Sequence, residues 1–290
     1  LAPQLAAHSD AILLNRALFA RIQTLFDQRQ ELPLEPEALR LLEQYHLDFV
    51  RAGAALTESE QDRMREINAE MATLQTLYSQ NVLSEVNDLA IVVDTEEEMA
   101  GMDEALKQAA SEEAAERGLP GKYVIPLLNT SGQPALASLQ NRSVRQRIFE
   151  TSLSRGSRGG DFDNRDVLSK VLSLRAERSA LLGFANHAEF ILANQTAQTV
   201  EAVNQRLAEL AAPAVANVRR EANDLQALIE SEGDDFQLAA WDWDFYTEKL
   251  RAKRFNFDAN QLRPYFELDN VLNRGVFYAA ERLFGVRFEE

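Results

Sequence analysis

Apolar residues recur every three or four positions over most of the chain, which is the period of an amphipathic α-helix. The pattern predicts a first helix with an N-cap at Ser9 or Asp10. The apolar stripe of this helix is formed by Ile12, Leu13, Phe19, Ile22 and Phe26. A second helix is predicted from Pro36, because proline suits the first helical turn, and its inward positions are Leu39, Leu42, His46, Phe49 and Val50.

A third helix has the clearest start signal. Thr57 and Glu60 have the spacing of a capping box, in which the hydroxyl and the carboxylate each bind a backbone N–H of the first turn. This helix is predicted to run to about residue 84. Its apolar seam is formed by Met64, Ile67, Met71, Leu74 and Tyr78.

The period changes at residues 90–93 and 123–127, where short β-branched runs predict strands. A helical pattern lies between them, from Glu96 to Arg117, and ends at Gly118. Pro126 has no N–H to donate, so its strand is expected at an edge. We therefore predict an all-α fold of long antiparallel helices, with one small two-stranded β element near 90–93 and 123–127.

The second half is again helical. Helices are predicted from Pro134, from Asn141, over residues 167–182, and from an N-cap at Thr199. The last of these continues past Pro213, and its inward positions are predicted to be Val200, Val203, Leu207, Leu210, Val218, Leu225 and Leu228. A final helix is expected from residue 269 to 285, followed at 286–288 by the opening of a strand whose partner is expected outside this chain. The loop-like stretch 155–161 suggests a boundary between a subdomain at 1–156, which holds the β element, and a second helical subdomain at 157–290.

The charge and composition of the chain make some classes of binding partner unfavourable. The chain has 290 residues and a net charge of −16, which disfavours nucleic acid and anionic membranes as partners. It has no cysteine and no apolar run long enough to span a bilayer, and its first residues lack the features of a signal peptide. We expect a cytoplasmic protein. The absence of an initial methionine suggests a piece of a longer chain.

Local motifs give no catalytic or metal site. The histidines, His8, His46 and His187, have no metal-ligand spacing, and His46 is predicted to pack in the core. Residues 161–166 resemble the start of a calcium loop, but Arg165 and Asp166 occupy the positions of an oxygen ligand and a glycine. Residues 118–122 are predicted to form a turn rather than a phosphate loop.

Two clusters leave alternatives open. The first is basic and could neutralise acidic neighbours or face an anionic partner; it comprises Arg142, Arg145, Arg147, Arg155 and Arg158. The second is the aromatic segment 241–246, which contains Trp241 and Trp243. It could be a packed corner or a binding wall, because a buried indole needs a partner for its N–H.

The aromatic segment also carries a resemblance. Residues 238–246, 261–268 and 271–277 resemble segments of the thimet oligopeptidase family of zinc metallopeptidases, above all its bacterial peptidyl-dipeptidases. Residues 1–3, 124–130, 133–136 and 181–184 resemble other segments of the same family, in the same order. The resemblance thus extends over nearly the whole chain.

The resemblance implies a peptidase that cleaves short peptides in a channel between two mostly helical halves. Such enzymes bind zinc through an H-E-x-x-H helix and a later glutamate, and the motif glutamate acts as general base. No H-E-x-x-H occurs in this sequence. The resemblance therefore implies an N-terminal part without the zinc-bearing catalytic half, inactive alone, with no zinc expected on this chain. Residues 157–290 would lead into that missing half.

No catalytic or metal residue is assigned, and the substrate-binding residues are unknown. The implied partners are short peptides and the missing half, with no nucleic acid and no membrane. The surface near Phe277, Phe284 and Phe288 is expected to be apolar and exposed. The alternative is a metal-free helical module that binds peptides or a partner protein.

Overall fold

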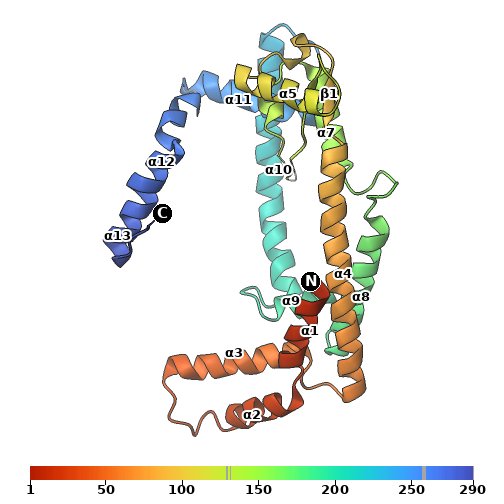
Figure 1. Cartoon of the computed structure of the whole chain (residues 1–290), viewed down its shortest axis with the longest axis vertical. Coiled ribbons are helices and arrows are strands. Elements are labelled where there is room, and N and C mark those ends of the chain that lie inside the picture. The colour runs from red at the N-terminus through yellow and green to blue at the C-terminus, as the bar shows by residue number, and fades with distance from the viewer. Residues whose placement is uncertain (129, 131, 257–258, 290) are drawn as a thin grey trace.

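The computed structural model describes residues 1–128, 130, 132–256 and 259–289. Two long helices, α4 (Glu58–Asp88) and α10 (Val200–Ser231), dominate the molecule. Figure 1 shows short helices at one end of this pair and a compact group of helices and strands at the other. The C-terminal helices leave that compact group as a separate arm, shown in blue. The described part of the chain is mainly helical, as predicted.

The N-terminal helices differ from the prediction. The single expected helix is in fact two, α1 (Ala2–Leu13) and α2 (Arg16–Asp27), and Ser9 and Asp10 lie inside α1. The break occurs because Asn15 is the N-cap of α2 and accepts a hydrogen bond from the Leu18 N–H. The predicted start at Pro36 is confirmed by α3 (Pro36–Ala52).

Helix α4 begins with the predicted capping box. The Thr57 hydroxyl accepts from the Glu60 N–H, and the Glu60 carboxylate accepts from the Thr57 N–H. Ile67 and Met71 form a buried cluster with Leu174 of α8 (Arg165–Leu181). The bidentate Arg63–Glu177 pair, with nitrogen–oxygen distances of 2.6 and 2.8 Å, also joins these two helices. Helix α8 is thereby packed along α4.

The β element is confirmed. Strand β1 (Ile91–Val93) pairs antiparallel with β2 (Tyr123–Ile125), and Ile91 lies opposite Ile125. The helix between them starts later than predicted, as α5 (Glu104–Glu116), because Asp103 caps it; a 3-10 turn occupies Glu97–Met99. The helices α6 (Ala135–Ser138) and α7 (Arg142–Leu153) complete this end and start where predicted.

The largest apolar core lies at this end of the molecule. It joins both strands to α5, α6 and α7. Its buried members are Val86, Leu89, Ile91, Val93, Met99, Ala110, Ile125, Leu127, Leu136, Leu139, Val144 and Ile148.

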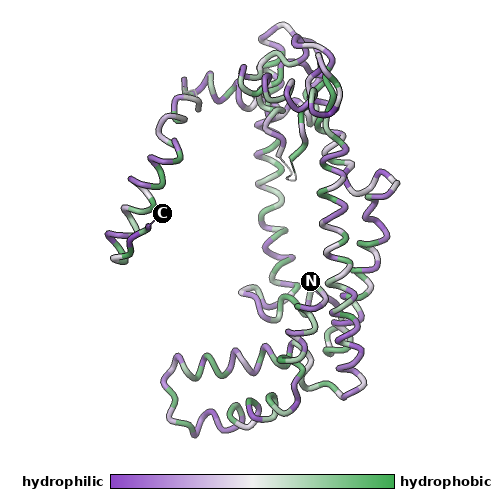
Figure 2. Tube along the Cα trace, in the orientation of Figure 1, coloured by the Kyte–Doolittle hydropathy of each residue, from purple (hydrophilic) through white to green (hydrophobic). Residues whose placement is uncertain are grey.

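For helix α10 (Val200–Ser231), part of the predicted buried face is wrong. Its Thr199 cap and its continuation past Pro213 are confirmed, but only its C-terminal end is buried, at Leu225, Leu228 and Ile229. Four apolar side chains in its middle are 48–59% exposed, namely Leu207, Leu210, Val215 and Val218. Figure 2 shows hydrophobic positions along this whole helix. The apolar period is real, but no element of the described chain covers its middle part.

The C-terminal arm is helical with one irregularity. After a 3-10 turn at Ala240–Asp242 come α11 (Trp243–Phe255) and a 3-10 segment, Ala259–Phe266. The predicted last helix comprises α12 (Leu268–Asn270), a π-helical segment at Val271–Phe277 and α13 (Tyr278–Phe284). The expected strand opening at residues 286–288 is not formed, because no edge lies beside it in the described chain.

The expected exposure of the arm holds for two of its three phenylalanines. Phe284 and Phe288 are 78% and 54% exposed. Phe277 is less exposed than expected and is half-buried, because its ring stacks on that of Phe288 at 4.4 Å between centroids.

Contacts cross the loop at residues 155–161. Glu85 of α4 accepts a hydrogen bond from the Gly156 N–H, and Asn81 donates to the Asn164 side chain at 3.0 Å. Asp242 binds Arg142 and Arg145 of α7. The division into 1–156 and 157–290 stays a prediction.

Candidate functional site

The three histidines lie in different surroundings. His46 packs as predicted: its ring stacks on Phe26 at 3.7 Å between centroids and hydrogen-bonds Gln23 at 2.8 Å. Burial lowers the pKa of His46 below its usual value, since it disfavours the charged ring. His8 is exposed on α1, and His187 begins the short helix α9 (His187–Leu192).

These positions do not fit a zinc ion. Within the described ranges, no group of three histidine, cysteine, aspartate or glutamate side chains could hold a metal ion. The pKa of His187 is lowered by burial and then by the charges of Arg175 and Arg178. A cation would meet the same two positive charges there, so His187 is a poor ligand for zinc.

The acidic loop at 161–166 is occupied by its own residues. The Asp163 carboxylate accepts from the Gly159 N–H at 2.7 Å and pairs with Arg165 at 2.6 Å. Hydrogen bonds from the Arg165 side chain hold the pKa of Asp163 well below its usual range. This loop is therefore closed by internal bonds and is not arranged as a calcium loop.

The aromatic segment forms a packed corner, one of the two alternatives that the sequence left open. Its centre is Asp242, which is fully buried and accepts from Arg142 and Arg145, each at 2.8 Å. The Ala239 N–H also donates to this carboxylate, at 3.1 Å. Two of the five clustered arginines thus neutralise an internal carboxylate and not an external anion.

The corner is further fixed by aromatic rings. Arg142 lies 4.2 Å from the ring centroid of Phe236, and Arg145 lies 4.2 Å from that of Phe245. Burial raises the pKa of Asp242, but the hydrogen bonds from Arg142 and Arg145 outweigh it, so the pKa lies below its usual value. The corner is a structural joint between α7 and the start of α11.

Two more of the clustered arginines also have internal partners. Arg147 donates to the Val92 carbonyl at 2.6 Å, and Arg155 donates to the carbonyls of Leu128 and Thr130 at 2.7 and 2.8 Å. The basic cluster is therefore largely part of the scaffold.

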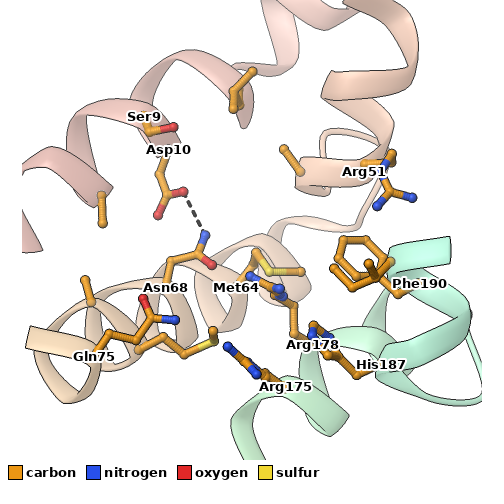
Figure 3. A pocket seen from close by; sticks show the side chains of 16 residues that line it. Ser9, Asp10, Arg51, Met64, Asn68, Gln75, Arg175, Arg178, His187 and Phe190 are labelled. Carbon is orange, nitrogen blue, oxygen red and sulfur yellow. Dashed lines mark hydrogen bonds between the residues drawn. The ribbon is translucent and has the colours of Figure 1, made fainter. Parts of the chain in front are cut away.

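A polar cleft lies elsewhere, between α1, α3, α4, α8 and α9 (Figure 3). Its volume is about 450 Å³, which is the size of a small-molecule site. Its lining includes Arg51, Arg175, Arg178 and His187, together with the buried ring of Phe190. We call this group the arginine cleft.

The opposite wall of the arginine cleft carries a carboxylate. Asp10 of α1 is 8% exposed and accepts from the Asn68 amide at 2.8 Å. Figure 3 shows Asp10 across the cleft from Arg175 and Arg178. Burial raises the pKa of Asp10 above its usual value, and the Asn68 hydrogen bond and the charge of Arg65 oppose it.

Sequence reasoning did not find the arginine cleft. Arg175 and Arg178 are three residues apart on one helix, a spacing that places them on one face. Arg51 comes from a distant part of the chain and reaches the cleft by stacking on Phe190 of α9, while the packing of α9 against α8 places His187 there. The Arg175–Arg178 spacing in an acidic chain was the single available signal.

Comparison with known proteins identifies the family. The model of peptidase family M3 matches residues 135–290, more than half of the chain. The chain belongs to peptidase family M3. The matched part of this M3 chain includes the Asp242 corner, the arginines on α8 and the exposed stretch of α10.

Three relatives resemble this M3 chain over almost its full length. The dipeptidyl carboxypeptidase of Escherichia coli strain K12 is 38% identical over 287 residues, which are 99% of this chain and 42% of that protein. The protein of the same name from Salmonella typhimurium is 39% identical over the same shares. Oligopeptidase A of Escherichia coli is 29% identical and also matches 99% of the chain. The chain thus spans less than half the length of these relatives.

Among the helices of the described residues, none is long and apolar enough to cross a membrane.

Proposed function

We propose that this chain is the N-terminal part of a zinc metallopeptidase that hydrolyses short peptides and releases dipeptides from their C-termini. The observation that carries the proposal is the 38–39% identity to two dipeptidyl carboxypeptidases through 99% of the chain. In this proposal zinc and the catalytic groups belong to residues outside the chain, and the chain alone is inactive. Its own residues are assigned no catalytic role.

The exposed stretch of α10 supports a role as a channel wall. Leu207, Leu210, Val215 and Val218 fall on one side of the helix, because successive residues are turned by about 100°. An exposed apolar stripe on a long helix marks a surface that another element covers. We propose that the catalytic half packs on this stripe, and that the wall so formed admits only short, unfolded peptides.

The C-terminal arm supports the same arrangement. Leu283 and Phe284 are 74% and 78% exposed at its end, and Leu268 is 67% exposed further back. Side chains of this size are costly to leave in water together. In the proposal residues 157–290 lead into the catalytic half, while 1–156 form the distal subdomain. The partners are then short peptides and that half, with no nucleic acid or membrane, and the location is the cytoplasm.

Enzyme assays on two proteins test the proposal. The first is the 290-residue chain, which is expected to bind no stoichiometric zinc and to release no dipeptide from an N-blocked tripeptide. The second is the product of the same reading frame, should it continue past Glu290, which is expected to contain H-E-x-x-H and to release the dipeptide with zinc. Activity of the chain alone would refute the assignment of an inactive part.

A longer product without H-E-x-x-H and without activity would favour the alternative, a metal-free helical module that binds peptides or a partner protein. The two hypotheses also differ in what the α10 stripe does. Leu207→Gln should leave the stability of the chain alone within about 0.5 kcal/mol, because this side chain is already exposed. In the active longer protein the same substitution should lower stability or activity, and the exposed polar control Gln205→Ala should not.

A further inference from the structure

The arginine cleft concentrates positive charge. Burial lowers the pKa of Arg51, and the nearby charge of Asp48 opposes this shift. Arg51, Arg175 and Arg178 form no ion pair and no side-chain hydrogen bond with any residue in the described part of the chain. Elsewhere the pattern is different: Arg63, Arg142 and comparable residues pair with carboxylates. In a chain with a net charge of −16, acidic partners are not scarce.

Two of the three guanidinium groups share one aromatic partner. Arg51 lies 4.3 Å and Arg178 lies 5.3 Å from the ring centroid of Phe190. Burial lowers the pKa of Arg178 below its usual value, and the charges of Arg175 and Arg51 lower it further. Each arginine is half-buried, so part of its hydration has been lost without replacement.

Two nitrogens in this group are buried and unsatisfied. They are Nε of Arg178 and Nδ1 of His187, neither of which has a hydrogen-bond partner among the described residues. A buried donor without a partner costs about 1–3 kcal/mol, so such groups are commonly paired with something. Figure 3 shows the side chains of Arg175, Arg178 and His187 gathered at one side of the cleft.

The helix ends explain only part of this arrangement. Arg51 lies in the last turn of α3, and Arg178 lies in the last turn of α8, where the helix dipole favours a cation. The interaction with the helix dipole needs only a positive charge near the helix end. It does not explain why these arginines line one cleft, or why two guanidinium groups stack on one ring. It also leaves the donors of the guanidinium forks unused.

We propose that the arginine cleft binds a small oxyanion of the phosphate class, held by Arg51, Arg175 and Arg178. Phosphate carries between one and two negative charges near pH 7 and offers several acceptor oxygens. Planar guanidinium forks match such oxygens with two parallel N–H donors each. A monocarboxylate offers one charge and two oxygens, and would leave most of the three arginines uncompensated.

Phosphate binding at this cleft does not depend on the proposed peptidase function. Asp10 on the opposite wall accepts from Asn68 and, among the described residues, forms no ion pair with the three arginines. The carboxylate of Asp10 repels an anion, so it keeps the anion away from the α1 wall of the cleft. The expected position of the anion is therefore beside α8 and α9.

Isothermal titration calorimetry of the 290-residue chain tests the proposal, with inorganic phosphate as titrant at constant ionic strength. Saturable one-site binding is expected, and acetate at the same concentration should bind at least about tenfold more weakly. Arg178→Gln and Arg175→Gln should each weaken phosphate binding about ten- to a hundredfold, since each removes charge-assisted hydrogen bonds.

Arg206→Gln is the matched control. It removes the same charge from an exposed face of α10, where Arg206 is 72% exposed, and it should leave the phosphate affinity unchanged. Circular dichroism of each variant confirms that it is folded, and Arg178→Lys, which keeps the charge, should retain more affinity than Arg178→Gln. The proposal is overturned if phosphate does not bind saturably, if acetate binds equally well, or if Arg206→Gln weakens binding as much as Arg178→Gln.

Discussion

Replacing Asp242 with asparagine would leave two arginines around a neutral amide. In the native corner Arg142 donates to the carboxylate from Nε at 3.0 Å and from Nη2 at 2.8 Å. Arg145, which is 1% exposed, donates at 2.8 Å. The substituted amide would keep one acceptor oxygen but would supply no charge. The buried guanidinium of Arg145 would then have no counter-charge.

The magnitude follows from this geometry. Removing one partner of a buried ion pair costs about 3–5 kcal/mol, because the remaining charge stays desolvated. Asparagine keeps part of the hydrogen bonding, so we expect the lower end, about 3 kcal/mol. A domain with a total stability of about 5–15 kcal/mol loses a large fraction of it by such a change.

Urea unfolding followed by tryptophan fluorescence measures this loss of stability with a probe at the Asp242 corner itself. The chain has two tryptophans, Trp241 and Trp243, and they flank Asp242 on both sides. A shift of the midpoint by about 1 M or more is expected for a loss of this size. Asp244→Asn is the control, since Asp244 is exposed in the same segment, and it should change stability by no more than about 0.5 kcal/mol.

The pH dependence gives a second test. Because the pKa of Asp242 is lowered on folding, its contribution is present above the unfolded pKa of about 4 and is lost as pH falls through the folded pKa. The difference between the native chain and Asp242→Asn should therefore be constant from about pH 5 to 8 and shrink only in stronger acid. Equal midpoints of the two proteins at neutral pH would refute the reasoning.

Three further predictions concern the scaffold. Thr57→Ala should lower the free energy of unfolding by about 1 kcal/mol, measured in urea, because the capping box is lost. Gly101→Ala should cost about 3 kcal/mol or more, since φ is +92° and a Cβ would lie 2.1 Å from the Ser138 carbonyl oxygen; Gly118→Ala, with open space around it, should cost clearly less. Trypsin should cut the native chain first in the loop 155–161, and the two pieces should stay together in gel filtration; pieces that separate would contradict the contacts across the loop.

The helical class could be predicted from the sequence because it depends on local rules. The caps at Thr57, Asn141 and Thr199 satisfy the first N–H groups of their helices from adjacent side chains, so short segments contain the whole signal. The strands were found for the same reason, since their β-branched runs interrupt a helical period. The missed break at Asn15 shows the limit, because an apolar stripe can continue across two consecutive helices.

Burial could not be predicted in the same way. The apolar period of α10 predicts that Leu207 and Leu228 are both buried. In the structure Leu207 is 59% exposed and Leu228 is 7% exposed. The difference is whether another element of the chain packs there. Periodicity gives the direction of an apolar face, and the presence of a partner is a tertiary property.

The sequence by itself determined the helices, the small β element and, through its resemblance, the peptidase family. The tertiary structure decided which charges are compensated. Arg145 and Arg178 are both arginines on amphipathic helices, but Arg145 meets Asp242 and Arg178 meets Arg51 and Arg175 instead. Electrostatic energy depends on distances between side chains that the chain brings together only on folding, and no local pattern encodes those distances.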